Sequence, residues 1–244
     1  MKASPEDQAR LLDLAALDTR EQQLSHRAKS LPELAELAEL ETSTAEVRAL
    51  LLAQTGERED TEREFGRIES DVEVVTTRIA RDTERLESSS SVKDVAGLEL
   101  ELASLRTRLD NLEDMQLTLM ELLEEREKTE QGTRQEFEEF QSRVADASAR
   151  RDAALAEIEA ERATVTDDRG KLVAVLPAEL VALYEKQRER YGVGASHLRG
   201  GVSSASGVTL HESDLAAIRA AAPDDVVLCP SSNAILVRTS ESGL

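Results

Sequence analysis

The chain has 244 residues, of which 33% are charged and only 2% are aromatic, and its formal net charge is −20. This composition is typical of long charged helices and argues against a large globular core, which buries more aromatic side chains. The negative charge disfavours generic binding to nucleic acids and anionic membranes. No apolar run approaches the roughly 20 residues of a membrane span, and the first residues lack the apolar core of a signal peptide. We therefore expect a cytoplasmic protein without membrane contact.

The first two predicted elements are helices. Residues 5–26 have apolar side chains on one face, which predicts a short amphipathic helix. Residues 30–33 interrupt it, and Pro32 suits the first turn of a second helix. From Pro32 to about Leu86, apolar side chains recur at a spacing of three and four residues, which predicts one arm of a coiled coil. This first seam consists of Leu34, Leu37, Thr44, Val47, Leu51, Phe65, Ile68, Val72, Val75, Ile79 and Leu86.

A turn and a second arm follow. The serines at 88–91 are poor helix formers, so we expect the chain to reverse within residues 88–95. A second seam with the same spacing then begins. It consists of Leu98, Leu102, Leu105, Leu109, Leu112, Leu119, Leu123, Phe137, Phe140, Val144, Ala154 and Ile158.

Polar interruptions indicate how the two seams pair. Residues 54–60 interrupt the first seam and residues 127–132 interrupt the second, at about equal distances from the serine turn. Folding the chain back at this turn places apolar beside apolar and polar beside polar residues, which parallel pairing in a dimer would not. We therefore expect an intramolecular antiparallel hairpin, whether the protein is a monomer or a dimer.

The second arm is expected to fray near 164–170, where Thr, Asp and Gly cluster, and a further helix is expected from Pro177 to Arg190. The predicted boundaries are therefore a helical hairpin at 1–170, a connecting helix at 171–192 and a separate module at 193–244.

Short apolar runs in the C-terminal module predict strands. They lie at 207–210, 226–228 and 234–237, and the last two are joined by residues 229–233 as a hairpin turn. Residues 213–222 predict a short helix between the first two runs.

These features together resemble the bacterial C4-type zinc-ribbon protein family with an N-terminal coiled-coil hairpin. The resemblance spans nearly the whole chain and implies a mainly α fold, in which a long antiparallel coiled-coil hairpin carries a small C-terminal α+β zinc-ribbon-like module. It rests on Leu176, Pro177, Glu179, Leu180, Tyr184, Glu185, Tyr191, Gly192, residues 207–210, Asp214, Leu215, Ile218 and residues 226–238.

Family members bind zinc through two Cys-x-x-Cys knuckles, the second followed by Gly-Arg-Ile-Leu. Carried over by position, the four ligands fall on Ser203, Ser206, Cys229 and Ser232. A serine hydroxyl is too weakly acidic to replace a thiolate on structural zinc, and neither His197 nor His211 stands at knuckle spacing. We therefore expect a degenerate ribbon without metal or other cofactor, stabilised by an apolar core.

One basic stretch is the best candidate for nucleic-acid contact. It consists of Arg169, Lys171, Lys186, Arg188, Arg190 and Arg199. These residues alternate with glutamates, and the module offers almost no aromatic side chains for base stacking. A solvated helix face is the favoured interpretation.

No residue pattern indicates catalysis. The carboxylates recur beside Arg and Lys on helix faces, and there is no phosphate-binding glycine loop or nucleophile triad. The resemblance implies binding of RNA or of partner proteins, such as an alternative sigma factor in flagellar regulation, and no enzymatic activity. We therefore expect an adaptor protein without a small-molecule substrate; a nucleic-acid-binding regulator is the alternative.

Overall fold

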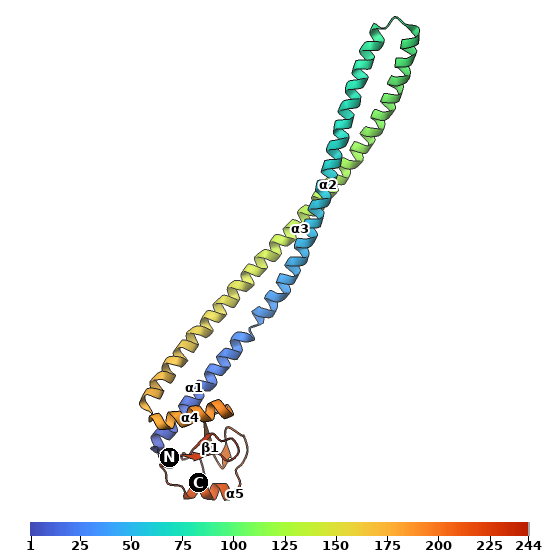
Figure 1. Ribbon diagram of the computed structural model, residues 1–244. Coiled ribbons are helices and arrows are strands. Elements are labelled where there is room, and N and C mark those ends of the chain that lie inside the picture. Colours follow the sequence, from blue (N-terminus) through green and yellow to red (C-terminus); the bar gives the residue numbers. More distant parts are fainter. Residues whose placement is uncertain (244) are drawn as a thin grey trace. The chain divides into compact units, whose positions relative to one another are not determined.

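The computed structural model describes residues 1–243 of the chain (Figure 1). The helices are α1 (Pro5–Lys29), α2 (Pro32–Ser88), α3 (Val92–Val175), α4 (Ala178–Tyr191) and α5 (Glu212–Ala220). The strands are β1 (Ala195–Arg199), β2 (Val202–Ser203), β3 (Val227–Leu228) and β4 (Ile235–Val237). The fold is thus mainly α, with a long helical hairpin and a small C-terminal sheet region, as predicted. Within residues 1–243, no helix is both long and apolar enough to cross a membrane.

The chain forms two compact units whose boundaries differ from the predicted ones. Unit 1 contains Met1–Leu34 and Arg150–Leu244, and unit 2 contains Ala35–Ala149. The outer ends of the predicted 1–170 hairpin therefore belong with the C-terminal module. The predicted connecting helix at 171–192 is also divided, because residues 171–175 complete α3 and α4 starts at Ala178.

Unit 2 is an antiparallel pair formed by α2 from Ala35 onward and by α3 as far as Ala149 (Figure 1). Ser91 precedes α3, and its hydroxyl oxygen accepts a hydrogen bond from the Asp94 amide at 3.4 Å, as an N-cap side chain does. The turn is thus shorter than residues 88–95. Apolar side chains from both arms meet in two clusters, and all their buried members except Leu40 and Ala147 belong to the predicted seams. The buried members are Ile68, Val75, Leu105 and Leu112 in one cluster and Leu37, Leu40 and Ala147 in the other.

Unit 1 is built around the first helix. Ser4 caps α1 by accepting a hydrogen bond from the Asp7 amide at 3.0 Å, and Pro5 occupies the first turn. Leu11 and Leu14 on α1 are completely buried against α4 and the sheet. The apolar face of α1 therefore forms part of the core of the C-terminal module.

The expected fraying at 164–170 is wrong, because α3 continues without a break to Val175. Two contacts with α1 hold this stretch in place. Arg169 donates a hydrogen bond to Asp18 at 2.7 Å, and Val165 packs against the cluster of Leu24 and Ile158. Tertiary contacts thus override the weak local helix preference.

The sheet has the strand order β2-β1-β4-β3. β1 pairs with β4 in parallel, and the other two pairs are antiparallel. The predicted β3–β4 hairpin is present, and its turn is closed by a 2.9 Å hydrogen bond from the Asn233 amide to the Cys229 carbonyl. The strand expected at 207–210 is wrong. Only an isolated bridge from Thr209 to Val202 forms there, and β1, for which no strand was predicted, is one of the two central strands.

The first residues of the chain pair with the segment before β3. The Ala3 amide donates to the Asp224 carbonyl at 2.8 Å, and the Val226 amide donates to the Met1 carbonyl at 3.1 Å. The Lys2 ammonium also lies 2.9 Å from the Asp224 carboxylate. The N-terminus is therefore fixed to the C-terminal module within unit 1.

Candidate functional site

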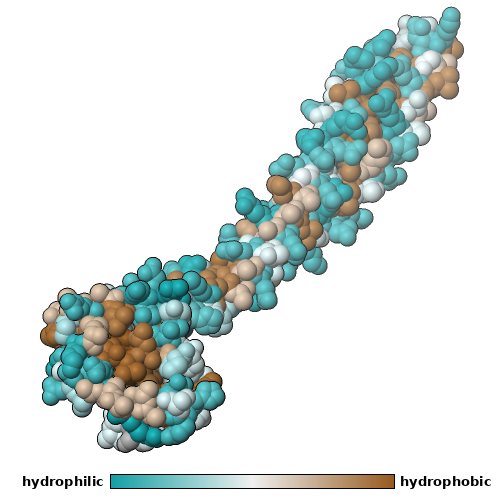
Figure 2. All heavy atoms as spheres, turned by 60° about the horizontal axis from the view of Figure 1, so that its bottom comes forward, coloured by the Kyte–Doolittle hydropathy of each residue, from teal (hydrophilic) through white to brown (hydrophobic). Residues whose placement is uncertain are grey.

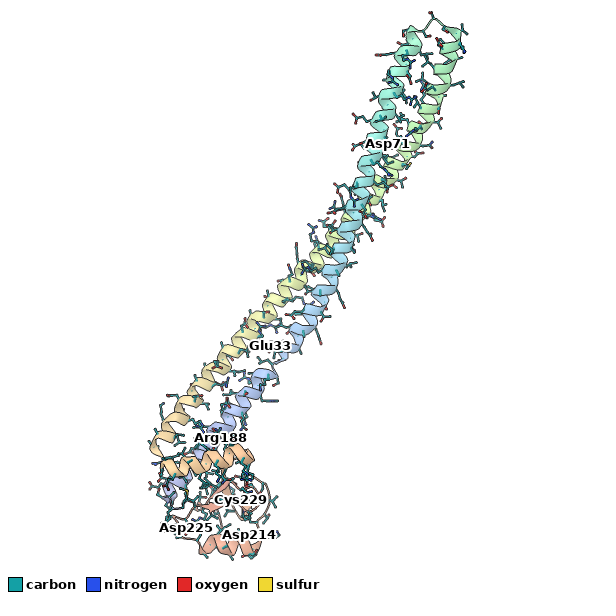
Figure 3. The ribbon with its side chains drawn as sticks, viewed as in Figure 1. Glu33, Asp71, Arg188, Asp214, Asp225 and Cys229 are labelled. Atoms are coloured by element: carbon teal, nitrogen blue, oxygen red, sulfur yellow. The ribbon has the colours of Figure 1, made fainter. Side chains whose placement is uncertain are left out.

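The residues at the expected ligand positions lie close together in the C-terminal module. Ser203 belongs to β2, and Cys229 opens the β3–β4 turn, where Figure 3 labels it. Their side chains are completely buried, and the Cys229 thiol donates to the Ser203 hydroxyl at 3.3 Å. Ser206 contacts the hydroxyl of Ser231 at 3.3 Å. The two turns that would carry the knuckles therefore face each other.

The remaining polar atoms of this cluster are also hydrogen-bonded. Ser203 and Ser196 exchange a hydrogen bond at 2.8 Å, and the Ala205 amide donates to Ser196 at 3.0 Å. The Cys229 sulfur also lies 3.3 Å from the Ser231 hydroxyl. Hydroxyl and thiol groups that bond to one another link the two turns.

This donor set does not fit zinc. Structural zinc is held by thiolates and imidazoles, and here one thiol stands beside serine hydroxyls. His197 uses its Nε2 to contact the Thr239 hydroxyl at 2.8 Å, and His211 lies exposed at the start of α5. Among the described residues, no group of three or more His, Cys, Asp or Glu side chains could hold a metal ion.

The Cys229 thiol is shifted toward ionisation. Burial opposes the charged form, but the hydrogen bonds that link Cys229 to Ser203, Ser231 and Ser232 outweigh it and lower the pKa from 9.0 to about 7. The side chain nevertheless has no exposed surface. A buried thiolate of this kind can be stabilised without being reachable by a substrate.

A partly buried ionic network around Asp18 forms the second polar cluster of unit 1. The carboxylate of Asp18 on α1 accepts hydrogen bonds from Tyr184 at 2.6 Å, from Arg169 at 2.7 Å and from Arg188 at 3.3 Å. Both arginines also pair with Glu185. Burial, and next the hydrogen bond to Asp18, raise the pKa of Tyr184, so its hydroxyl stays protonated. The network joins α1, α3 and α4.

A pocket of about 450 Å³ lies beside this network. Its wall includes Asp18, Tyr184, Arg188 and His197. All four side chains have hydrogen-bond partners within the protein. The polar groups of this pocket are therefore engaged in contacts that hold unit 1 together.

The basic stretch does not form a free cationic surface. Arg188 on α4 is paired with Asp18 and Glu185, and Arg199 is paired with Glu241 at 2.6 Å. Arg190 lies over the Tyr191 ring, 5.4 Å from its centroid. Lys186 is exposed. Arg169 is also paired with Asp18 and Glu185, and Lys171 is paired with Asp167 and Asp168. Carboxylates of the same protein therefore neutralise most of the basic stretch.

Unit 2 contains an apolar groove that the sequence analysis did not identify. Its volume is about 770 Å³. It is lined by Glu41, Thr44, Ala45, Arg48, Ala49 and Leu52 of α2 and by Phe137, Gln141, Val144 and Ala145 of α3. The available signal was the run Leu50–Leu52, because three consecutive residues of a helix cannot all face one seam. Leu52 is 74% exposed and Leu50 is 49% exposed.

Figure 2 shows that apolar patches interrupt the hydrophilic surface of the helical hairpin. Apolar atoms also gather on the displayed face of unit 1. The groove differs from a flat patch because both helices of unit 2 contribute to its walls.

The polar interruptions of the two seams meet inside unit 2. Glu130 is 5% exposed and accepts hydrogen bonds from Arg58 at 2.7 Å, Thr55 at 3.1 Å and Arg134 at 2.6 Å. Burial opposes ionisation, but these hydrogen bonds outweigh it and lower the pKa of Glu130. Both arms remain helical here, so the interruptions form an ionic crosslink between α2 and α3, in the predicted register.

The fold and its sites define a coiled-coil hairpin protein with a small α+β module. The family model of the CT398-like coiled coil hairpin domain matches residues 14–192. The chain belongs to this family. The match ends before β1, so it does not include residues 193–244.

Relatives and solved structures agree with this assignment. The chain is 37% identical to an uncharacterized protein of Mycobacterium tuberculosis over 242 residues, which cover 98% of each chain. A solved structure from Mycobacterium smegmatis is 35% identical, covers 98% of this chain and 100% of its own, and superposes with a TM-score of 0.88. The structure of CT398 from Chlamydia trachomatis shares the fold at 16% identity, with a TM-score of 0.66 and coverage of 95% and 97%.

Proposed function

We propose that this protein is a non-enzymatic adaptor that binds protein partners through the groove of its helical hairpin. The observation that carries the proposal is the exposure of Leu52 in an apolar groove formed by two otherwise charged helices. Concave apolar surfaces on soluble proteins commonly bind other proteins or ligands.

The C-terminal module acts in this proposal as a metal-free, ribbon-like head. The facing turns at Ser203 and Cys229 support a zinc-ribbon origin, and the hydrogen bonds between them support stabilisation without zinc. The polar groups beside Asp18 are hydrogen-bonded within the protein, which supports a structural role for the unit 1 pocket. We propose a cytoplasmic location for the adaptor.

Nucleic-acid binding has less support. Two of its candidate contacts, Arg188 and Arg199, form ion pairs with carboxylates of the same protein. Because the net charge is −20, the rest of the surface repels a nucleic acid, which is a polyanion.

Photo-cross-linking in cells tests the adaptor function. A photoreactive amino acid at Leu52 should cross-link reproducibly to a specific partner protein. Leu100 is the matched control, because it is a leucine of unit 2 that is 75% exposed and lies outside the groove lining. Equal labelling from both positions, or a turnover activity that follows the purified protein, would contradict the proposal.

A further inference from the structure

We propose that the helical hairpin of unit 2 contains a hinge, at the level of Gly56 on α2 and Gly132 on α3, about which its two halves bend. The tip half contains the apolar cluster of Ile68, and the base half contains the apolar cluster of Leu37. Both helices continue through the hinge without a break (Figure 1). The inference is independent of the proposed adaptor function, because it concerns a motion of the hairpin and not what the hairpin binds.

The two glycines lie at the same level of the hairpin. Glu130 on α3 accepts hydrogen bonds from Thr55 at 3.1 Å and from Arg58 at 2.7 Å, and these two residues flank Gly56 on α2. Gly132 follows Glu130 closely in α3. A Cβ atom at either glycine would have nothing within 4 Å, so close packing does not require glycine at these positions. Glycine weakens the interior of a helix relative to alanine, and here it weakens both arms together.

The apolar packing of the hairpin is interrupted at this level. No apolar residue between Leu40 and Ile68 on α2, or between Leu112 and Ala147 on α3, is buried. The residues of these two stretches that are buried are polar, and they are Thr61, Glu130 and Thr133. Closely packed apolar side chains interdigitate and resist deformation. The stretch between the two clusters is therefore where bending loses the least packing.

A backbone carbonyl next to Gly56 is shared with two side chains. The Glu57 carbonyl accepts a hydrogen bond from the Thr61 hydroxyl at 2.9 Å and another from the Arg126 guanidinium of α3 at 2.5 Å. A threonine that bonds to the carbonyl four residues earlier slightly destabilises a helix and often bends it. Side chains that enter the ladder of backbone hydrogen bonds are also a recognised cause of kinks. Two independent causes of bending thus meet in neighbouring residues of α2.

One polar atom at this level has no hydrogen-bond partner. The Oε1 atom of Gln54 on α2 is buried, and no partner for it lies within residues 1–243. A buried acceptor without a partner raises the free energy of the arrangement that contains it. A bend that admits water to this atom relieves that cost.

Ionic contacts hold the two arms together at the hinge. Arg58 reaches from α2 to Glu130, and Arg126 reaches from α3 to the Glu57 carbonyl. Arginine side chains have several rotatable bonds, so they can keep these contacts over a range of angles between the helices. The hairpin therefore bends without losing the register of its arms.

Hydrogen exchange of the full-length protein tests the weak point. Backbone amides at 54–61 and 128–135 should exchange at least about tenfold faster than those at 68–75 and 105–112, because local opening is easiest where few apolar side chains are buried. A variant that carries both Gly56→Ala and Gly132→Ala should slow exchange at the hinge about fivefold. Gly97→Ala is the matched control, because Gly97 also lies in α3 with nothing within 4 Å of its Cβ position. It should leave exchange at the hinge unchanged.

Residual dipolar couplings distinguish bending from local opening. A lanthanide tag on Thr76→Cys aligns the tip half, since Thr76 is exposed and the native Cys229 has no exposed surface to react. Motion about a hinge averages the couplings of the half that carries no tag. We expect the alignment fitted to the base half to be smaller than that of the tip half by roughly a fifth or more. The variant with both Gly56→Ala and Gly132→Ala should bring the two values together.

Three outcomes would overturn the inference. Equal alignment of the two halves in the wild-type protein would show a rigid hairpin, whatever the exchange rates are. An equal effect of Gly97→Ala and of the double alanine variant would mean that any gain in helix stability suffices. Spin labels at Glu59 on α2 and Lys128 on α3 should keep a narrow distance distribution, and a broad one would mean that the arms separate instead of bending together.

Discussion

Tyr184 donates its hydroxyl hydrogen to the carboxylate of Asp18 over 2.6 Å, although the two residues are 166 positions apart in the chain. Tyr184 is completely buried, and Asp18 is 7% exposed. This contact and the two arginines around it tie the first helix to the helix that precedes the sheet. The stability of unit 1 therefore depends on residues near both ends of the chain.

Replacing Asp18 should strongly destabilise unit 1. Asp18→Ala leaves Arg169 and the Tyr184 hydroxyl without their shared acceptor, and we expect a loss of about 3 kcal/mol in the free energy of unfolding. Urea denaturation measures it. Glu161→Ala is the control, because Glu161 forms exposed ion pairs with Arg20 and Arg27, and pairs of this kind contribute less than about 1 kcal/mol. Equal losses would refute the role of the buried network.

The ionic crosslink at Glu130 should fix the register of the hairpin. Glu130→Ala leaves Arg58 without its main partner, and we expect a loss of about 2–4 kcal/mol in the free energy of unfolding. Since the pKa of Glu130 is lowered in the folded state, its contribution is present above the ordinary carboxylate pKa and is lost as the pH falls through the folded value. The difference in the free energy of unfolding between wild type and Glu130→Ala should therefore become smaller at acidic pH.

The double variant Arg58→Met with Glu130→Leu separates stability from register. An apolar pair of similar size should recover most of the lost stability, while the arms gain freedom to slide. Distance measurements between spin labels on α2 and α3 should then show a broader distribution than in wild type. An unchanged distribution would mean that the apolar seams alone determine the register.

Gly194 should tolerate no side chain. A Cβ at this position would lie 2.4 Å from the Tyr184 ring, which is completely buried and cannot move aside. We expect Gly194→Ala to lower the melting temperature, with a cost of about 1–3 kcal/mol. Gly170→Ala is the matched control within unit 1. Gly170 lies in α3 with nothing within 4 Å of its Cβ position. The alanine variant should be more stable by up to about 1 kcal/mol, because alanine has the higher helix propensity.

Cys229 should titrate near neutrality. As the sole cysteine of the chain, it can be followed by thiolate ultraviolet absorbance, and we expect a midpoint near its pKa of about 7. Ser203→Ala should raise this midpoint, whereas Ser206→Ala should not, because Ser206 bonds to Ser231 instead. The folded pKa lies below that of the free thiol, so the stabilisation is complete above the unfolded pKa and is lost as the pH falls through about 7.

Metal removal should leave the module unchanged. With serines at the other ligand positions, Cys229 lacks the thiolate partners of a structural zinc site. We expect near-zero zinc in protein purified without affinity metal, and the same melting temperature with and without EDTA. Stoichiometric zinc that is lost together with the fold would contradict the metal-free head.

The hairpin could be predicted because its signals are local and repeated. Seams of regular spacing define two helices, and the matching interruptions at 54–60 and 127–132 define their pairing, which the contact of Arg58 with Glu130 confirms. The β3–β4 hairpin could be predicted for the same reason, since its turn joins neighbouring segments.

Features that depend on distant contacts could not be predicted. β1 becomes a strand by pairing in parallel with β4, about forty positions later, and its own sequence carries little strand pattern. The apolar face of α1 indicates that Leu11 and Leu14 are buried, but not that their partners lie in the C-terminal module. The groove was missed because a seam pattern reports which residues face a partner helix, not how completely they are covered.

Unit 1 is assembled from the two ends of the chain, and this has a consequence for synthesis. Leu11 finds its partner Val237 only after 226 further residues have been translated, which takes roughly 10 to 50 seconds at ordinary elongation rates. Other members of the same cluster, such as Leu180, are translated earlier, and the contiguous segment Ala35–Ala149 has time to pair before the last strand completes the core around α1. Chaperone protection of the nascent N-terminus is therefore most needed before the last strand emerges.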